Sequence, residues 1–281
     1  MADAVTSLRR PLRMARIAPR LDLRRPLAPA IGWIAPALLV VIWQASASLG
    51  WLPDSLLPSP IAVLAAGWRL TLSGELPRNV EVSFLRAFAG LVVGGAIGFG
   101  FGLANGLTRV SDRLTDTTLQ MARNIPHLAL IPLVIVWFGI DEAAKLFLVA
   151  LGVFFPIYAN TLHGVRSVDP QLVEMAKSYG MRPFELFRRV ILPGALPSIF
   201  VGLRYALGVM WLTLIVAETL GATAGIGYLA MNAREFMQTD VVVMSIVLYA
   251  LLGKTADLVA VALERRWLRW LPQHAPAKVA P

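Results

Sequence analysis

Long apolar segments alternate with short polar ones along the chain. Each apolar segment holds about twenty residues, the length that an α-helix needs to cross a bilayer core of about 30 Å. The pattern therefore predicts six transmembrane helices, at about residues 31–49, 82–107, 117–139, 143–162, 195–217 and 241–263.

The longest charged stretch inside this apolar chain covers residues 166–194. Asp169 is placed to accept a hydrogen bond at the start of a helix, Pro170 suits the first helical position, and Gly180 suits a C-terminal stop. These signals predict a capped helix of about ten residues, which is too short and too polar to span a membrane.

Two other short helices are predicted in the connections. Ser59 and Pro60 supply an N-cap and a first helical residue for a helix that suits the membrane surface. A second helix is expected at residues 227–236, inside the glycine-containing connection 219–240. The predicted fold class is an all-α membrane protein.

Composition favours a polytopic membrane protein over a soluble one. Hydrophobic residues make up 57% of the 281, charged residues 15%, and the mean hydropathy is +0.66, whereas a soluble domain carries about 25% charged residues. The net charge of +9 is concentrated in chain ends and loops, as orientation signals are, so nucleic-acid binding is not expected. The chain has no cysteine, which excludes disulfides, thiolate metal sites and cysteine nucleophiles.

The positions of lysine and arginine predict the orientation. Basic residues concentrate in the N-terminal arm, a short loop at residues 109–116, the 166–192 loop and the C-terminal tail. By the positive-inside rule, both termini and the 166–192 loop are cytoplasmic. The predicted organisation is a basic arm at residues 1–30, a transmembrane domain at residues 31–270 and a tail at residues 271–281.

The second predicted span carries a glycine at every fourth position. This spacing places the glycines along one stripe of the helix, where missing side chains let another backbone approach closely. We therefore expect tight packing against a second helix, whose identity the spacing does not give. The stripe consists of Gly90, Gly94, Gly98, Gly102 and Gly106.

Four polar residues in the predicted spans are candidates for a translocation path. Arg204 is a cation inside a membrane helix, where it needs an anionic substrate, a carboxylate, helix-end carbonyls or a water-filled cavity. Glu218, at the outer end of the same span, suits the mouth of a path or a salt bridge between helices. Asn124 and His127 flank Pro126, which kinks the third span either for packing or near a path. His127 has no second histidine or carboxylate at ligand spacing, so no metal is expected.

Catalytic motifs do not fit the chain. Gly253-Lys254-Thr255 resembles the end of a phosphate-binding loop, but Leu248 stands where that loop needs a glycine. Neither Gly-x-Ser-x-Gly nor His-Glu-x-x-His is present. The expected function is transport and not catalysis, driven by a gradient or by a partner that supplies energy.

The 166–194 stretch resembles the cytoplasmic EAA motif of ATP-binding-cassette importer permeases. The matching residues are Glu174-Met175-Ala176, then Gly180, Val190 and Leu192-Pro193, with Met175 and Val190 in place of the usual alanine and isoleucine. The resemblance extends to the permeases for nitrate, sulfonate and taurine through residues 124–133, 135–145, 192–198 and 210–218. Within that family, residues 225–235 and 249–254 are similar to the permeases for aliphatic sulfonates.

The resemblance implies a type I importer permease fold and a larger assembly. It implies a homodimer of this chain, two copies of a cytoplasmic ATPase and an external sulfonate-binding protein, all acting at the lipid bilayer of a bacterial inner membrane. ATP is then used by the ATPase, and this chain binds no cofactor. The residues expected at the ATPase interface are Glu174, Met175, Ala176, Gly180 and Arg182.

Two alternatives accompany this interpretation. The same machinery could carry taurine or nitrate, since specificity is expected to reside in the external binding protein. A gradient-driven secondary transporter is the other alternative, but such a protein needs no ATPase-docking helix and usually carries internal repeats, which the sequence does not display.

Overall fold

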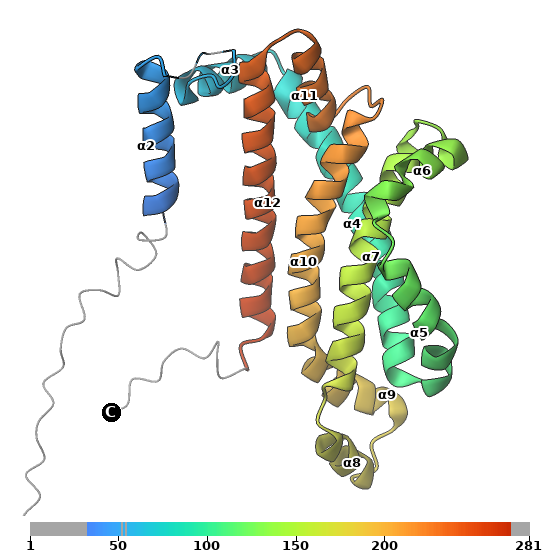
Figure 1. The fold of residues 1–281 in the computed structure, drawn as a ribbon. Coiled ribbons are helices and arrows are strands. Elements are labelled where there is room, and N and C mark those ends of the chain that lie inside the picture. The colour runs from blue at the N-terminus through green and yellow to red at the C-terminus, as the bar shows by residue number, and fades with distance from the viewer. Residues whose placement is uncertain (1–32, 52, 54, 271–281) are drawn as a thin grey trace, which may run out of the picture.

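The structure is a computed structural model that describes residues 33–51, 53 and 55–270 (Figure 1). The predicted arm at residues 1–30 and the tail at residues 271–281 lie outside this part of the chain. Every regular element in the described residues is a helix. In chain order these are α2 (Ile34–Ser48), α3 (Pro60–Leu72), α4 (Glu75–Leu107), α5 (Arg109–Arg123), η1 (His127–Leu130), α6 (Ile131–Phe138), α7 (Glu142–Arg166), α8 (Pro170–Ser178), α9 (Pro183–Leu186), η2 (Phe187–Ile191), α10 (Leu192–Thr219), α11 (Ile226–Glu235) and α12 (Thr239–Trp267).

Four helical segments of the described chain are long and apolar enough to cross a membrane. They are α4, α7, the continuous stretch Pro183–Thr219 that ends in α10, and α12. These confirm the predicted second, fourth, fifth and sixth spans as helices. The first predicted span is represented by α2, which has 15 residues and is shorter than a bilayer core requires. The described residues thus contain four spans, or five if a bent pair counts as one, against the six predicted.

The bent pair replaces the predicted third span. A single kinked helix was expected at residues 117–139, after a loop at residues 109–116. Instead α5 begins at Arg109, and the chain bends by 83° between α5 and the segment His127–Phe138. The predicted loop at residues 109–116 is therefore wrong, whereas the predicted third span falls within a bent pair that passes as one span only when its two parts are taken together. Pro126 explains the break, because a proline disfavours helical backbone in the residue before it.

The loop prediction at residues 109–116 failed because α4 and α7 provide partners for the polar face of α5. Asn105 on α4 accepts a hydrogen bond from Ser111 and donates one to Thr115. Arg166, at the end of α7, forms an ion pair with Asp112. A segment that looks too charged for a packed helix is thus stabilised by groups distant in the sequence.

Helix α7 lies between α4 and α10 (Figure 1). It packs against α10 through glycines on both helices: Gly152 of α7 faces Thr213, and Gly202 of α10 faces Asn160 and the carbonyl of Pro156. The largest apolar cluster then joins α4, α7, α10, α11 and α12, with Val149, Val153 and Leu214 fully buried. This cluster fixes the relative positions of the long helices.

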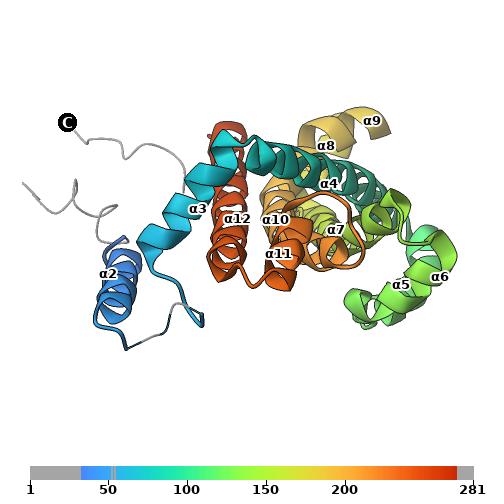
Figure 2. The same ribbon diagram turned by 90° about the horizontal axis from the view of Figure 1, so that it is seen from above.

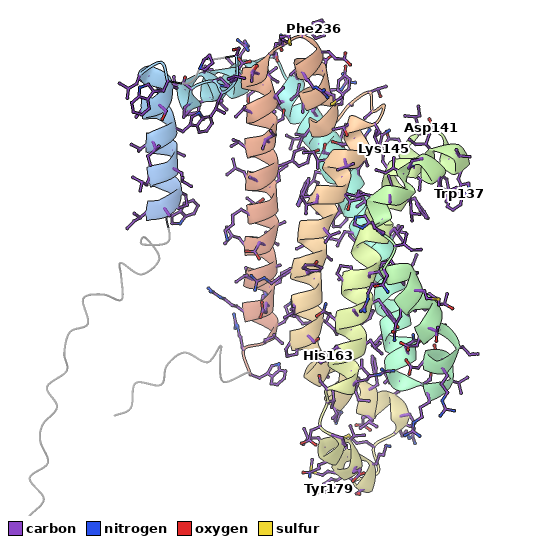
Figure 3. The ribbon with its side chains drawn as sticks, viewed as in Figure 1. Trp137, Asp141, Lys145, His163, Tyr179 and Phe236 are labelled. Carbon is purple, nitrogen blue, oxygen red and sulfur yellow. The ribbon has the colours of Figure 1, made fainter. Side chains whose placement is uncertain are left out.

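Short elements cover the two ends of the long helices. Figure 3 places Phe236, Asp141 and Lys145 at one end, together with α3, α6 and α11; we call it the α11 end. His163 and Tyr179 lie toward the opposite end, which carries α8 and α9; we call it the α8 end. Seen from above, α3 leads from α2, at one edge of the molecule, past α12 to α4, while α5 and α6 form the other edge (Figure 2). The polar connections predicted to lie on opposite sides of a membrane are therefore at opposite ends of the fold.

Candidate functional site

Helix α8 has the caps that its sequence predicts. The side chain of Asp169 accepts a hydrogen bond from the backbone N–H of Gln171 at 2.8 Å, and Pro170 is the first helical residue. At the other end Gly180 has φ +78°, and the N–H groups of Gly180 and Met181 donate to the carbonyls of Lys177 and Ala176. This pair of bonds is a Schellman motif, which needs a residue with positive φ at the glycine position.

The residues of the expected ATPase interface differ in accessibility. Glu174, Met175, Gly180 and Arg182 are exposed at the α8 end, whereas Ala176 is 2% exposed. Ala176 therefore packs α8 onto its neighbours and offers no surface. Three large apolar side chains near these positions are also exposed in the part of the chain that the structure describes: Leu172, Tyr179 and Phe184.

The glycine stripe of α4 lies against α7. A Cβ at Gly90 would collide with the side chain of Val149, and one at Gly94 or Gly98 would collide with the backbone of Ala150 or Phe154. Gly102 and Gly106 are as close to Thr161 and Val165. Helix α7 is thus the second helix that the spacing left unidentified, and the two backbones approach as the repeat predicts.

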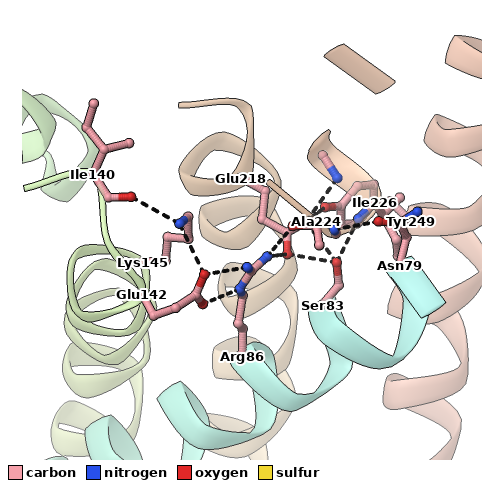
Figure 4. A network of polar contacts seen from close by, with 12 residues as sticks. Asn79, Ser83, Arg86, Ile140, Glu142, Lys145, Glu218, Ala224, Ile226 and Tyr249 are labelled. Carbon is pink, nitrogen blue, oxygen red and sulfur yellow. Dashed lines mark hydrogen bonds and ion pairs between the residues drawn. The ribbon is translucent and has the colours of Figure 1, made fainter. Parts of the chain in front are cut away.

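A buried polar network occupies the α11 end, with Glu218 at its centre (Figure 4). Glu218 is 1% exposed and accepts hydrogen bonds from the hydroxyls of Ser83 and Tyr249 at 2.8 and 2.9 Å. It also accepts one from the N–H of Gly227 in the first turn of α11 at 2.9 Å. The Nη1 of Arg86 completes the set at 2.8 Å. Since a buried carboxylate needs such partners, Glu218 is fully accommodated between helices.

The same network fixes the start of α11. Asn79 accepts a hydrogen bond from the N–H of Gly225 at 2.7 Å, and Ser83 accepts one from the N–H of Ile226 at 2.8 Å. The first N–H groups of a helix have no partner within the helix, and here side chains of α4 and α10 supply one. Arg86 holds the preceding loop through the carbonyl of Ala224.

Arg86 extends the network to α7. Its guanidinium contacts both oxygens of Glu142, and Glu142 also lies 3.3 Å from the ammonium of Lys145. Lys145 is 4% exposed and donates a second hydrogen bond, to the carbonyl of Ile140 (Figure 4). Of the two roles considered for Glu218, the structure contains the salt bridge between helices.

Arg204 is paired with carboxylates of α12. Its Nε and Nη2 lie 3.0 Å from Oδ1 of Asp257, and its Nη1 lies 3.9 Å from Glu264. The side chain nevertheless remains 43% exposed. Arg204 therefore has a carboxylate partner and, at the same time, an accessible guanidinium.

Asn124 and His127 have different surroundings. Asn124 is exposed at the end of α5. His127 is half-buried, and its Nε2 lies 3.0 Å from the hydroxyl of Thr213 on α10. The histidine thus attaches the bend between α5 and α6 to α10.

Sequence analysis missed most of the partners of these residues. Asn79, Ser83 and Arg86 were not singled out, although Asn79 and Ser83 continue the direction of the glycine stripe, at spacings that place them on the same side of α4. That continuation is the signal that could have identified them. Asp257 and Tyr249 carry no such local signal, because their roles depend on which helix lies beside α12.

Comparison with known proteins agrees with this architecture. The family of binding-protein-dependent transport system inner membrane components matches residues 96–269. The chain is 62% identical over 242 residues to the aliphatic sulfonates transport permease protein SsuC of Escherichia coli, covering 86% of this chain and 92% of that protein. It is 40% identical over 251 residues to SsuC of Bacillus subtilis, with coverages of 88% and 91%.

A third relative carries a different substrate name. The chain is 35% identical over 264 residues to the taurine transport system permease protein TauC of Escherichia coli, covering 92% of this chain and 95% of that protein. The family match spans well over half of the chain, and each of these relatives is matched over nearly its whole length. The chain therefore belongs to the inner membrane components of binding-protein-dependent transport systems, the permeases that its EAA-like motif indicated.

Proposed function

We propose that this permease carries aliphatic sulfonates inward across a bacterial inner membrane. The observation that carries the proposal is the 62% identity to SsuC of Escherichia coli over 86% of the chain, well above the 35% identity to TauC. Taurine is itself a sulfonate with an added amine, so it is the closest alternative; nitrate is a more distant one.

Energy for the transport comes from ATP hydrolysed by a partner. The 166–192 loop is the proposed contact, because α8 is short, capped at both ends and surrounded by exposed side chains of apolar and charged type. A rigid amphipathic helix of this kind fits a groove in another protein. Glu174, Met175 and Arg182 would contact the ATPase, Gly180 would end the helix, and Ala176 would seat it on the permease.

The assembly contains a second copy of this chain, two ATPases and an external binding protein that delivers the sulfonate. In this arrangement the α8 end faces the cytoplasm, both termini are cytoplasmic and α2 is the first of six spans. Exposed apolar side chains along α2 support its placement against lipid or the second copy: Leu38, Leu39, Val40, Val41 and Ile42. Gradient-driven transport is not favoured, since it gives α8 no role.

Growth of a deletion strain tests the substrate. The strain lacks this chain and carries it on a plasmid, with an empty plasmid as control. We expect the plasmid-borne chain to restore growth on ethanesulfonate as sole sulfur source, and to have little effect with taurine as sulfur source or nitrate as nitrogen source. Restoration with taurine or nitrate alone would contradict the proposed substrate, and restoration without the ATPase gene would contradict the energy source.

A further inference from the structure

Three charged side chains meet on one face between α10 and α12. Arg204 donates to Oδ1 of Asp257 at 3.0 Å, and Nζ of Lys254 lies 3.3 Å from Oδ2 of the same carboxylate. Glu264 lies farther along α12, 3.9 Å from Arg204. One carboxylate is therefore shared by two cations; we call Arg204, Lys254 and Asp257 the ion cluster.

The position of the ion cluster along its two helices predicts that it lies at the depth of the bilayer core. At 1.5 Å per residue, Asp257 is about 15 Å from the last residue of α12, and Arg204 is about 18 Å from the first residue of α10. With Trp267 at the membrane interface, both positions fall within a hydrocarbon core of about 30 Å. Charged side chains at this depth that faced lipid would cost several kcal/mol, so such residues face protein or water.

The ion cluster is accessible in the described chain. The side chains of Arg204, Asp257 and Lys254 are 43%, 34% and 54% exposed. Gly208 lies one turn beyond Arg204 and Gly253 one turn before Asp257, and no described atom lies within 4 Å of where a Cβ would stand on either glycine. Charge, small residues and open space thus coincide on one face.

The groove beside the ion cluster has no cationic side chain in its lining that could bind an anion. It lies between α4, α10 and α12, has a volume of about 360 Å³ and is lined almost entirely by apolar side chains, including Phe88, Leu207 and Leu252. A sulfonate that entered it would lose its hydration without gaining hydrogen bonds. The accessible cations of the ion cluster are a better match for an anion in this part of the fold.

We propose that the ion cluster is an anion-binding station on the translocation path, where the sulfonate group replaces the Asp257 carboxylate on Arg204 and Lys254. This inference rests on the proposed function and specifies where the substrate is held. A guanidinium binds two oxygens of a planar or tetrahedral oxyanion through parallel N–H groups, so sulfonate and carboxylate compete for one site. The return of Asp257 to Arg204 then releases the substrate, which keeps binding weak enough for passage.

The test measures uptake of labelled ethanesulfonate into ATP-loaded vesicles that contain the permease with its ATPase and binding protein. The variant Arg204→Gln/Asp257→Asn removes one positive and one negative charge, so the net charge of the chain does not change. Lys254 and the nearby Glu264 remain as one cation and one carboxylate. If the pair only held α10 to α12, this neutral replacement would be tolerated. The matched control is Arg69→Gln/Asp240→Asn, which removes an ion pair between α3 and α12 at the α11 end.

We expect the double variant to assemble and hydrolyse ATP within about twofold of the wild type, while its uptake falls at least about tenfold, because loss of a charged partner typically costs more than 1.4 kcal/mol. Lys254→Gln, a change at a half-exposed side chain, should lower uptake similarly without affecting assembly. The control should take up ethanesulfonate normally.

Uptake within twofold of the wild type in either ion-cluster variant would overturn the inference while leaving the proposed function intact. Wild-type vesicles report the proposed function by themselves. If they accumulate ethanesulfonate equally well without ATP, or not at all while taurine or nitrate enters, the proposed function fails independently of the variants. Loss of assembly in the double variant with normal uptake by Lys254→Gln would also overturn the inference, because the pair would then be structural.

Discussion

Glu218 joins four helices through one carboxylate. It belongs to α10 and accepts hydrogen bonds from Ser83 and Arg86 of α4, the first turn of α11 and Tyr249 of α12. Removing Glu218 would leave Arg86, whose side chain is 9% exposed, with Glu142 as the one carboxylate partner that the structure describes. The cost of such a removal is the desolvation of the partners left behind, and it exceeds the value of the ion pair itself.

We therefore predict unequal effects for the two carboxylates that Arg86 contacts. Glu218→Ala should lower the unfolding free energy by about 3–5 kcal/mol, the typical cost of breaking a buried ion pair. Glu142→Ala should cost less, about 1–3 kcal/mol, because Glu142 itself is 64% exposed although its partners Arg86 and Lys145 are buried. Thermal unfolding of the two detergent-purified variants measures the difference. Equal losses would show that burial of Glu218 does not determine its contribution.

The second expectation concerns the end of α8. Gly180 and Gly74 both have φ +78°, and no described atom lies within 4 Å of where their Cβ would stand. A side chain at either position therefore meets conformational strain and not a clash. For an L-residue this strain is about 1–2 kcal/mol. The two glycines differ in place, because Gly180 ends α8 and Gly74 precedes α4 at the α11 end.

Gly180→Val should accordingly weaken co-purification of the ATPase and lower uptake several-fold, with membrane insertion unchanged. Gly74→Val carries the same strain and should leave co-purification unaffected. Gly180→Asn should restore part of the loss, because asparagine tolerates positive φ better than valine. Pull-down of the ATPase by tagged permease compares the three variants. If Gly74→Val released the ATPase as strongly, general destabilisation and not the shape of α8 would be responsible.

Local signals explain which elements the sequence could predict. The caps of α8 are formed by residues adjacent to the helix, so Asp169, Pro170 and Gly180 are sufficient to place it. The same holds for α3, where Ser59 accepts a hydrogen bond from the N–H of Ala62. Helix α5 was missed because its polar face depends on residues that come together only in the folded chain.

The candidate site was predicted less completely than the fold. The spacing of glycines on α4 predicted close packing against another helix but did not identify that helix. The structure shows that it is α7, which contacts the stripe through Val149 and Ala150. Arg204 was recognised as needing a counter-charge, but Asp257 could not be identified before α12 was known to lie beside α10. Pairings between helices far apart in sequence have no periodic signal, which is why these contacts required the structure.

At the level of the whole molecule, the main prediction is that the α8 end faces the cytoplasm and the α11 end faces the outside. The chain has no cysteine, so single cysteines can report exposure without a background. We predict that Phe236→Cys reacts with a membrane-impermeant maleimide on intact spheroplasts, whereas Tyr179→Cys reacts only after permeabilisation. Both side chains are well exposed, at 68% and 81%, and lie at opposite ends (Figure 3). The reverse pattern would place α8 outside the cell and remove it from the reach of a cytoplasmic ATPase.

The continuous helical stretch Pro183–Thr219 has a mechanical consequence. Helix α9 turns away from the axis of α10 (Figure 1), and the 28 residues of α10 correspond to a rod of about 42 Å that ends near the carboxylate of Glu218. Tilting such a rod by about 5° about one end moves the other end by about 4 Å. The π-helical turn at η2 lies close to the α8 end of this rod, where a wider helix is easiest to deform. A partner that tilts α10 at the α8 end would therefore move the network around Glu218 by about 4 Å for about 5° of tilt.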